Sequence, residues 1–223
     1  MTLADYGIIV ELEEDAKVPD CTGDIISIQL EDALRHVHSG VLSTSSKFFK
    51  NAIKDVWQHD GSKAIDLSDV NSTVFDLYIQ WLYTGRITKD PPSKLNHGMY
   101  QAQVYVLGEK IMDVQLQNAV LATIITDLID WGVESTVWST SQAIVALIYD
   151  GTPSNNPARK LLVDMWKRNA TVVLEQDATF LASMCNEFLA DLALALYALE
   201  KKDSRLSPHF GSMVPYMLPE DAE

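Results

Sequence analysis

Cysteine is scarce in this sequence, which contains only Cys21 and Cys185, far apart along the chain. A disulfide framework or a zinc knuckle needs several cysteines at short spacing, so neither is expected, and the pattern is typical of a reducing compartment. No apolar run reaches the roughly 18–20 residues that a membrane-spanning helix needs. The N-terminal residues are acidic, whereas a signal peptide begins with basic residues. We therefore expect a cytoplasmic or nuclear protein that spans no membrane.

Basic residues are also few. Seventeen lysines and arginines face thirty-one acidic residues, and the net charge is −14. Nucleic-acid affinity depends mainly on lysine and arginine contacts to phosphate, so no nucleic-acid partner is expected. One basic cluster, Arg159, Lys160, Lys167 and Arg168, is interrupted by apolar residues at helical spacing. That spacing favours a solvent-exposed helix face over an anion site.

Motifs for nucleotide binding and catalysis are absent. The sequence contains no GxxxxGK[ST], GxGxxG or GxSxG pattern, so no cofactor is expected. His36 and His38, in RHVHSG, leave open the alternative of a metal-dependent or hydrolytic enzyme. However, zinc needs a third and usually a fourth ligand, and Ser39 points away from its neighbour His38 on a strand. We therefore expect no metal site, no catalytic residue and no enzymatic activity.

The first half of the chain alternates short strands with helices. β-branched runs predict strands over 24–30, 34–38 and 64–67, and another starting at Arg86. Apolar residues at helical spacing predict helices over 48–57, 71–84, 99–110 and 114–131. Asn71 is a typical N-cap and Gly85 a typical residue after a helix end. Gly40–Leu42 is interpreted as a turn, and Ser43–Ser46 as a source of helix caps.

The second half is wholly helical in pattern. Helices are predicted over 134–149, from Pro157 behind an Asn156 cap, and over 177–200. Residues from 203 contain several prolines and are expected to be irregular. The elements together predict an α+β fold, in which helices cover a small three-stranded sheet and an all-α extension follows.

Several short patterns, in a fixed order over roughly residues 22–131, resemble the BTB/POZ domain. They are Asp24–Ile28, Val37-His38 with Val41-Leu42, Ser46–Phe49, Ile65–Val70 with Phe75, Tyr83-Thr84-Gly85, and Tyr105–Lys110 with Val114 and Leu116. Ile148-Tyr149, Thr152-Pro153 and Arg159–Asp164 resemble the helical extension of fungal members. The resemblance implies a BTB/POZ-like domain (22–131) and a helical extension (132–202), while the residues themselves predict an N-terminal strand and linker (1–21) and an irregular tail (203–223). It also implies structural roles for Asp24, His38, Leu42, Phe49, Tyr83 and Gly85.

The resemblance implies a function in protein association. Many members form homodimers through their first helices, often with an exchanged N-terminal strand, so we expect a self-associating adaptor or scaffold whose partners are proteins. The candidate interface is a set of apolar residues rimmed by acidic side chains: Ile8, Ile9, Val10, Leu12, Phe48, Ile53, Val56 and Trp57.

Two positions depart from the patterns of the family's known partner modes. Members that recruit a cullin scaffold carry hydrophobic-x-Glu where this chain has Val56-Trp57-Gln58. Because of this departure, a substrate adaptor of a cullin-type ubiquitin ligase is the alternative function and self-association the preferred one. Repressor-type members carry a basic residue after the motif histidine, where this chain has Ser39.

Overall fold

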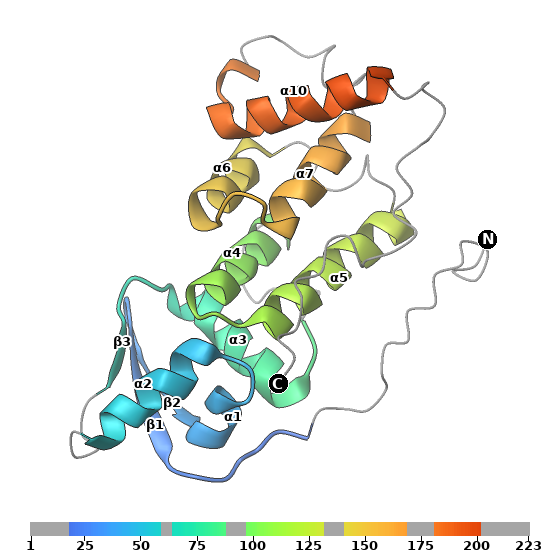
Figure 1. The fold of residues 1–223 in the computed structure, drawn as a ribbon. Coiled ribbons are helices and arrows are strands. Elements are labelled where there is room, and N and C mark those ends of the chain that lie inside the picture. Colours follow the sequence, from blue (N-terminus) through green and yellow to red (C-terminus); the bar gives the residue numbers. More distant parts are fainter. Residues whose placement is uncertain (1–17, 59–63, 88–96, 132–140, 169–180, 202–223) are drawn as a thin grey trace. The chain divides into compact units, whose positions relative to one another are not determined.

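A computed structural model describes residues 18–58, 64–87, 97–131, 141–168 and 181–201 (Figure 1). These residues fall into two compact units. The sheet unit comprises 18–58, 64–87 and 103–120, and the helical unit comprises 97–102, 121–131, 141–168 and 181–201. No helix in the described residues is both long enough and apolar enough to cross a bilayer. The domain boundaries expected at 21, 131 and 202 stay a prediction.

A three-stranded sheet forms the base of the sheet unit. Strand β1 (Ile25–Leu30) lies between β2 (Leu34–His38), with which it pairs antiparallel, and β3 (Ile65–Leu67), with which it pairs parallel. Alternate side chains enter the core: Ile26, Ile28 and Leu30 from β1, Val37 from β2, and Ile65 and Leu67 from β3. The strands predicted over 24–30, 34–38 and 64–67 and the α+β class are confirmed.

Two helices follow β2. Helix α1 (Ser39–Ser43) occupies the segment for which the sequence predicted a turn, and α2 (Lys47–Gln58) is the first predicted helix. Within the serine cluster, Ser46 is the cap of α2, because its Oγ accepts the Phe49 N–H at 3.1 Å. The hydroxyls of Ser43 and Thr44 instead donate to carbonyls of α1 four residues earlier, so these two residues end one helix and do not begin the next.

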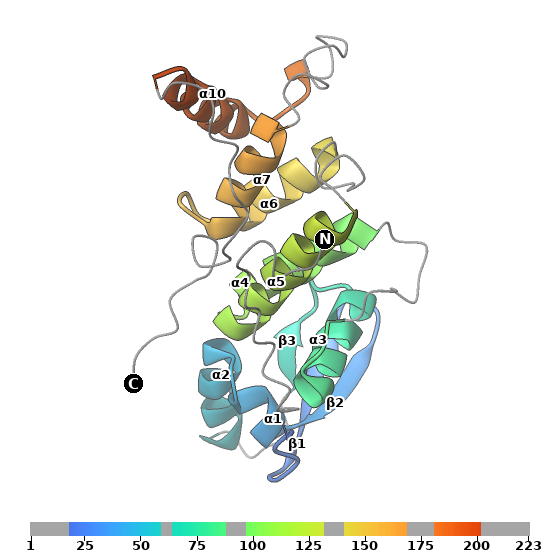
Figure 2. The ribbon, with the colours of Figure 1, turned by 90° about the vertical axis from the view of Figure 1, so that its right-hand side faces the viewer.

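Helix α3 (Ser72–Thr84) lies beside the sheet and has its ends as predicted (Figure 2). The Asn71 side chain accepts the Thr73 N–H at 3.0 Å. At the other end Gly85 has φ 67° and donates its N–H to the Trp81 carbonyl at 2.7 Å. A left-handed φ favours glycine, which has no Cβ to clash. The helix is buried along most of its length, as its apolar girth indicated.

Helices α4 (His97–Lys110) and α5 (Val114–Trp131) are divided between the two units. Helix α4 begins two residues before the predicted start, so His97 belongs to a helix and not to the predicted loop. The strand predicted from Arg86 is wrong for Arg86 and Ile87, which lie outside any strand; the rest of that prediction lies outside the described residues.

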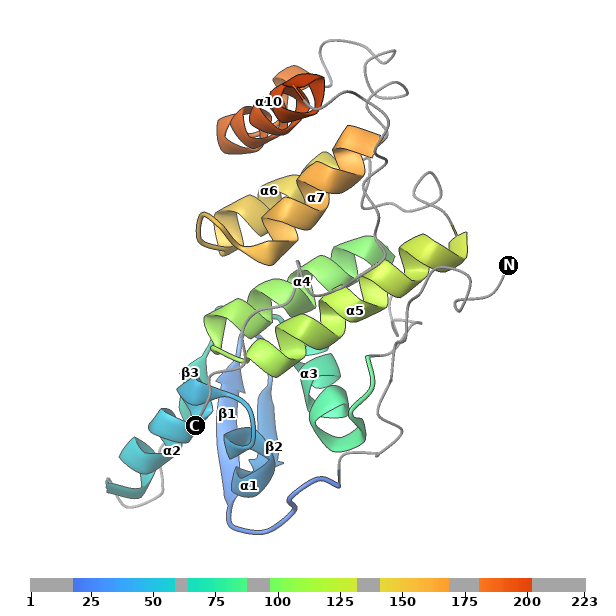
Figure 3. The ribbon, with the colours of Figure 1, turned by 45° about the vertical axis from the view of Figure 1, so that its right-hand side comes forward.

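Helices α6 (Gln142–Gly151), α7 (Pro157–Arg168) and α10 (Asn186–Lys201) pack together in the helical unit (Figure 3). The Asn156 cap of α7 is confirmed, since its Oδ1 accepts the Ala158 N–H at 2.9 Å. The long helix predicted over 177–200 is wrong at its start, because a break at 183–185 precedes α10. Residues 134–140 and 177–180 of the predicted helices lie outside the described part.

Candidate interaction surfaces and their supporting contacts

His38 ends β2 at the start of α1, and its ring holds the end of α3. His38 Nδ1 lies 2.6 Å from Tyr83 Oη, and the backbone N–H of His38 donates to the same hydroxyl at 3.4 Å. The two rings meet edge to face, with centroids 6.0 Å apart. His38 is half-buried. Its imidazole is therefore engaged in tying a strand to a helix.

His36 lies on the solvent face of the sheet, opposite Ser27 on β1. Its Nδ1 is 3.2 Å from Ser27 Oγ. Within the described residues, no carboxylate is hydrogen-bonded to His36, and no three His, Cys, Asp or Glu side chains are grouped to hold a metal. The described residues thus assemble neither a catalytic triad nor a metal site around the two histidines.

The chain segment that precedes β1 packs against α1. The Asp24 carbonyl accepts the Ser39 N–H at 2.9 Å, and the Thr22 carbonyl accepts the Gly40 N–H at 3.3 Å. A Cβ at Gly40 would lie 2.6 Å from the Asp20 carbonyl oxygen, so only glycine fits this close approach. The segment is therefore attached to α1 through backbone groups, while the Asp24 side chain is exposed.

The start of α2 is fixed on the turn between α4 and α5. Lys47 N–H donates to the Met112 carbonyl and Phe48 N–H to the Ile111 carbonyl, both at 3.3 Å. Ser46 Oγ donates to the same Ile111 carbonyl at 2.6 Å. These bonds satisfy N–H groups that a helix start leaves without partners. Phe48 is half-buried, and Met112 is 48% exposed. Two apolar side chains are thus displayed on a rigid backbone.

Asp113, the next residue of that turn, is a fully buried carboxylate with several donors. Its Oδ2 accepts from the Ser45 hydroxyl at 2.6 Å and from the Tyr78 hydroxyl at 3.2 Å, and its Oδ1 accepts the Leu116 N–H at 3.0 Å. Burial, and then the adjacent Asp113 charge, raise the pKa of Tyr78 well above its usual value. Sequence reasoning missed this cluster, although an aspartate directly before a predicted helix is an N-cap signal.

The exposed side of α2 is basic. Lys47, Lys50 and Lys54 are all exposed, and no acidic residue lies between them. The spacing of three and four residues places them on one stripe of the helix. The expected acidic rim is therefore wrong for this part of α2. Phe48 lies beside lysines in a chain whose net charge is −14.

The other predicted interface residues differ in what the structure shows. Ile53 is only 7% exposed, so its side chain belongs to the core. Val56 and Trp57 belong to α2, but their side chains lie outside the described residues, and so does the predicted strand from Ile8 to Leu12. Leu42 and Phe49 are fully buried. Phe49 packs among the rings of Phe48, Phe75 and Tyr78 at 5.1–6.3 Å.

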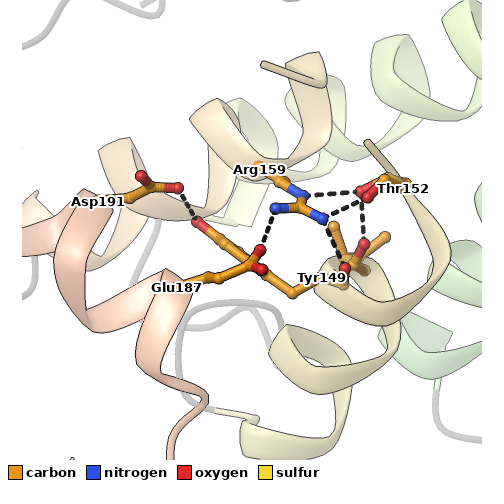
Figure 4. Close-up of polar contacts among 6 residues, drawn as sticks. Tyr149, Thr152, Arg159, Glu187 and Asp191 are labelled. Carbon is orange, nitrogen blue, oxygen red and sulfur yellow. Dashed lines mark hydrogen bonds and ion pairs between the residues drawn. The ribbon is translucent and has the colours of Figure 1, made fainter. Parts of the chain in front are cut away.

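In the helical unit, a buried arginine joins three helices (Figure 4). Arg159, 7% exposed in the first turn of α7, donates to the Thr152 hydroxyl at 3.1 Å, to the Tyr149 carbonyl at 2.6 Å and to the Thr152 carbonyl. It also donates to Glu187 of α10 at 2.6 Å and lies 4.5 Å from the centre of the Tyr149 ring. The solvated face predicted for this cluster is therefore wrong at Arg159, which caps the carbonyl end of α6.

A second cluster in the helical unit joins α4 to α5. The buried Asp127 carboxylate lies 3.0 Å from His97 Nε2 and accepts from Gln101 Nε2 at 2.9 Å. Because His97 was predicted to lie in a loop, its contact with Asp127 was not predicted. The contact serves to hold the two helices together.

The family model of the BTB/POZ domain matches residues 15–115. No curated protein matches the chain.

Proposed function

Because residues 15–115 are a BTB/POZ domain, a protein-interaction module, we propose that this chain associates with a second copy of itself through the start of α2 and acts as an adaptor or scaffold. Its other partners are proteins, and the interaction needs no cofactor. The use of the N-terminal strand Ile8–Leu12 as an exchanged element is part of the same proposal, on the strength of its apolar sequence.

The observation that carries the proposal is the apolar pair Phe48 and Met112. Met112 is 48% exposed and Phe48 is half-buried, and both belong to backbone that is hydrogen-bonded between α2 and the 111–113 turn. Apolar groups on a preorganised backbone lose little conformational entropy when they bind, so more of their burial contributes to affinity. The neighbouring lysines suit a partner surface with acidic side chains, which this chain has in excess.

Sedimentation velocity over a range of micromolar concentrations tests self-association. We expect the unchanged chain to sediment as a dimer or larger, and Phe48→Lys to weaken that association, because it places a charge in the contact. Met112→Lys is a second variant at an exposed position, in case Phe48→Lys perturbs folding. Leu34→Lys, at a 46% exposed position on the sheet, is the matched control. A monomeric unchanged chain, or equal association of Phe48→Lys, Met112→Lys and control, would contradict the proposal.

Two further proposals concern a cullin partner and the location in the cell. The cullin-adaptor alternative depends on the family alone, since the side chains of 56–58 lie outside the described residues; binding of a purified cullin N-terminal domain tests it. The proposed cytoplasmic or nuclear location is supported by Cys21 and Cys185, which are both free thiols. Imaging of the tagged chain tests it.

A further inference from the structure

The second half of α10 has an apolar surface that is not buried. Leu194 is 67% exposed and Tyr197 57% exposed. From residue 192 to residue 199 the sequence, LALALYAL, contains no charge, and no residue from 189 to 198 is buried. A helix that is apolar on all sides is normally covered by other parts of a protein. This stretch therefore has the composition of a buried helix and the exposure of a surface one.

The first half of α10 is firmly attached to the helical unit. Phe188 is fully buried, with its ring 5.2 Å from Trp166 and 5.6 Å from Tyr149. Glu187 accepts from Arg159, and Asp191 accepts from the Tyr149 hydroxyl at 2.8 Å. Figure 4 shows the polar contacts of Glu187 and Asp191. The exposed half is thus the continuation of an anchored, rigid helix, which lowers the entropy cost of binding through it.

The exposed face is complementary to itself about Leu194. Ala190 and Ala198 lie four residues before and after it, and Glu187 and Lys201 lie seven before and after. In an antiparallel pair with its two-fold axis near Leu194, Ala190 therefore faces the partner's Ala198, and the acidic Glu187 position faces the basic Lys201 position. An interface across a two-fold axis needs this self-complementarity, and small residues let two helices approach closely.

We propose that α10 binds α10 of a second copy of this chain in that antiparallel arrangement. The opposite charges at its ends matter because two copies with a net charge of −14 repel one another elsewhere. This surface belongs to the helical unit and shares no residue with the α2 surface of the sheet unit. Substitution can therefore remove either surface and leave the other, and a chain with only the α10 surface forms dimers.

Sedimentation velocity of four chains separates the two surfaces: unchanged, Leu194→Lys, Phe48→Lys and the double variant. We expect Leu194→Lys to weaken one association step by at least about tenfold, because it places an unpaired charge at the interface centre. Leu194 is exposed, so the variant should keep the helical content of the unchanged chain by circular dichroism. Leu34→Lys is again the control. If Leu194→Lys and Leu34→Lys associate equally, the α10 pairing is overturned, whatever Phe48→Lys does.

Cross-linking tests the geometry directly. In a Cys21→Ser, Cys185→Ser background, Leu194→Cys lies near the proposed axis, and a short bifunctional maleimide should link two copies. Ala182→Cys, exposed but before α10, is the matched control and should link far less. Equal linking at both positions contradicts the pairing. Loss of linking at Leu194→Cys on deleting 202–223 would also contradict it, because the tail would then be the contact between copies.

Discussion

Each unit of this chain has a buried charged side chain at a helix terminus, Asp113 in the sheet unit and Arg159 in the helical unit, and these two charges are opposite in sign. In the sheet unit, Asp113 receives two hydroxyl donors and a backbone N–H. In the helical unit, Arg159 donates to two backbone carbonyls, a hydroxyl and a carboxylate. Each charge stabilises a helix terminus: the carboxylate lies at the N–H groups that start α5, and the guanidinium lies at the carbonyl groups that end α6.

The difference between the units lies in what surrounds the charge. The sheet unit has a strand core and an aromatic cluster, with Phe75 and Tyr78 rings 5.6 Å apart and Tyr78 and Trp81 rings 6.0 Å apart. No sheet joins the described helices α6, α7 and α10. Arg159, which belongs to α7, contacts both α6 and α10. Removal of the buried charge should therefore damage the helical unit more than the sheet unit.

Arg159→Met should have the largest effect. It leaves the Tyr149 and Thr152 carbonyls without their donor, at a cost of about 3–5 kcal/mol of unfolding free energy. Hydrogen exchange measures where stability is lost, and we expect the greatest loss of protection in α6, α7 and α10. Lys160→Met, at the exposed neighbouring position, is the control and should change stability by less than about 0.5 kcal/mol. Equal effects of the two variants would show that Arg159 does not hold the helices together.

Asp113→Ala should have a smaller effect on the sheet unit. The Ser45 and Tyr78 hydroxyls lose their acceptor and α5 loses its cap, at a cost of about 2–4 kcal/mol. Urea unfolding measures the change. Asp113→Asn keeps an acceptor oxygen and should recover about half of the loss. If Asp113→Asn is as unstable as Asp113→Ala, the negative charge matters and not the acceptor geometry.

The order of the elements was predictable from local signals. β-branched runs predicted the strands. The caps Asn71, Asn156 and Gly85 predicted helix ends, because each forms a hydrogen bond to backbone within a few residues. The five-residue α1 was not predicted, since a helix that short has almost no periodicity to detect.

The supporting contacts were not predictable, because each joins residues far apart in sequence. Asp113 meets Ser45, and Arg159 meets Glu187, only after the chain has folded. Local spacing placed Arg159 with Lys160, but one side chain turned inward to the end of α6 and the other stayed exposed. Of the proposed interface, Phe48 was predictable as an apolar residue at a helix start. Met112 was not, because the left-handed turn that displays it carries no glycine.

Alkaline pH should expose another difference between the units. Burial raises the pKa of Tyr100 to about 12 and raises the pKa of Tyr149 further, and both tyrosines belong to the helical unit. In the described part of the sheet unit, burial raises the pKa of Tyr78. When the pKa of a tyrosine is raised in the folded state, its contribution to the free energy of unfolding is complete below the unfolded-state pKa, which is near 10. That contribution decreases as the pH rises above this value. Each tyrosine contributes a slope of up to about 1.4 kcal/mol per pH unit.

Urea unfolding between pH 8 and 12 measures this slope. Tyr100→Phe should reduce the loss of stability above pH 10 by one tyrosine's share, while its stability at pH 8 stays near that of the unchanged chain. Tyr197→Phe is the control, because it removes the same hydroxyl from a tyrosine that is 57% exposed. An unchanged slope in Tyr100→Phe would contradict the burial argument.

Glu187→Gln should cost far less than Arg159→Met, although the two residues form one ion pair. The Glu187 side chain is 71% exposed and the Arg159 side chain 9% exposed, so water replaces the partner of one and not of the other. We expect a loss below about 1 kcal/mol, smaller still at high salt. Equal losses in the two variants, measured by urea unfolding, would mean that the pair and not the carbonyl contacts stabilises the unit.

The smallest effects should come from backbone strain, of which each unit has one non-glycine example in the part of the chain that the structure describes. Met112 in the sheet unit has φ 52°, and Asn155 in the helical unit has φ 69°. A left-handed φ costs methionine about 1 kcal/mol, whereas asparagine adopts it more readily. Relief of strain by glycine is offset by about 0.5–1 kcal/mol of added freedom in the unfolded chain. Met112→Gly should therefore be neutral or slightly stabilising, and Asn155→Gly slightly destabilising. Met112→Val, which is branched at Cβ, should be less stable than both glycine variants. Thermal unfolding measures the order of the three variants, and an order other than this would contradict the assignment of the strain to φ.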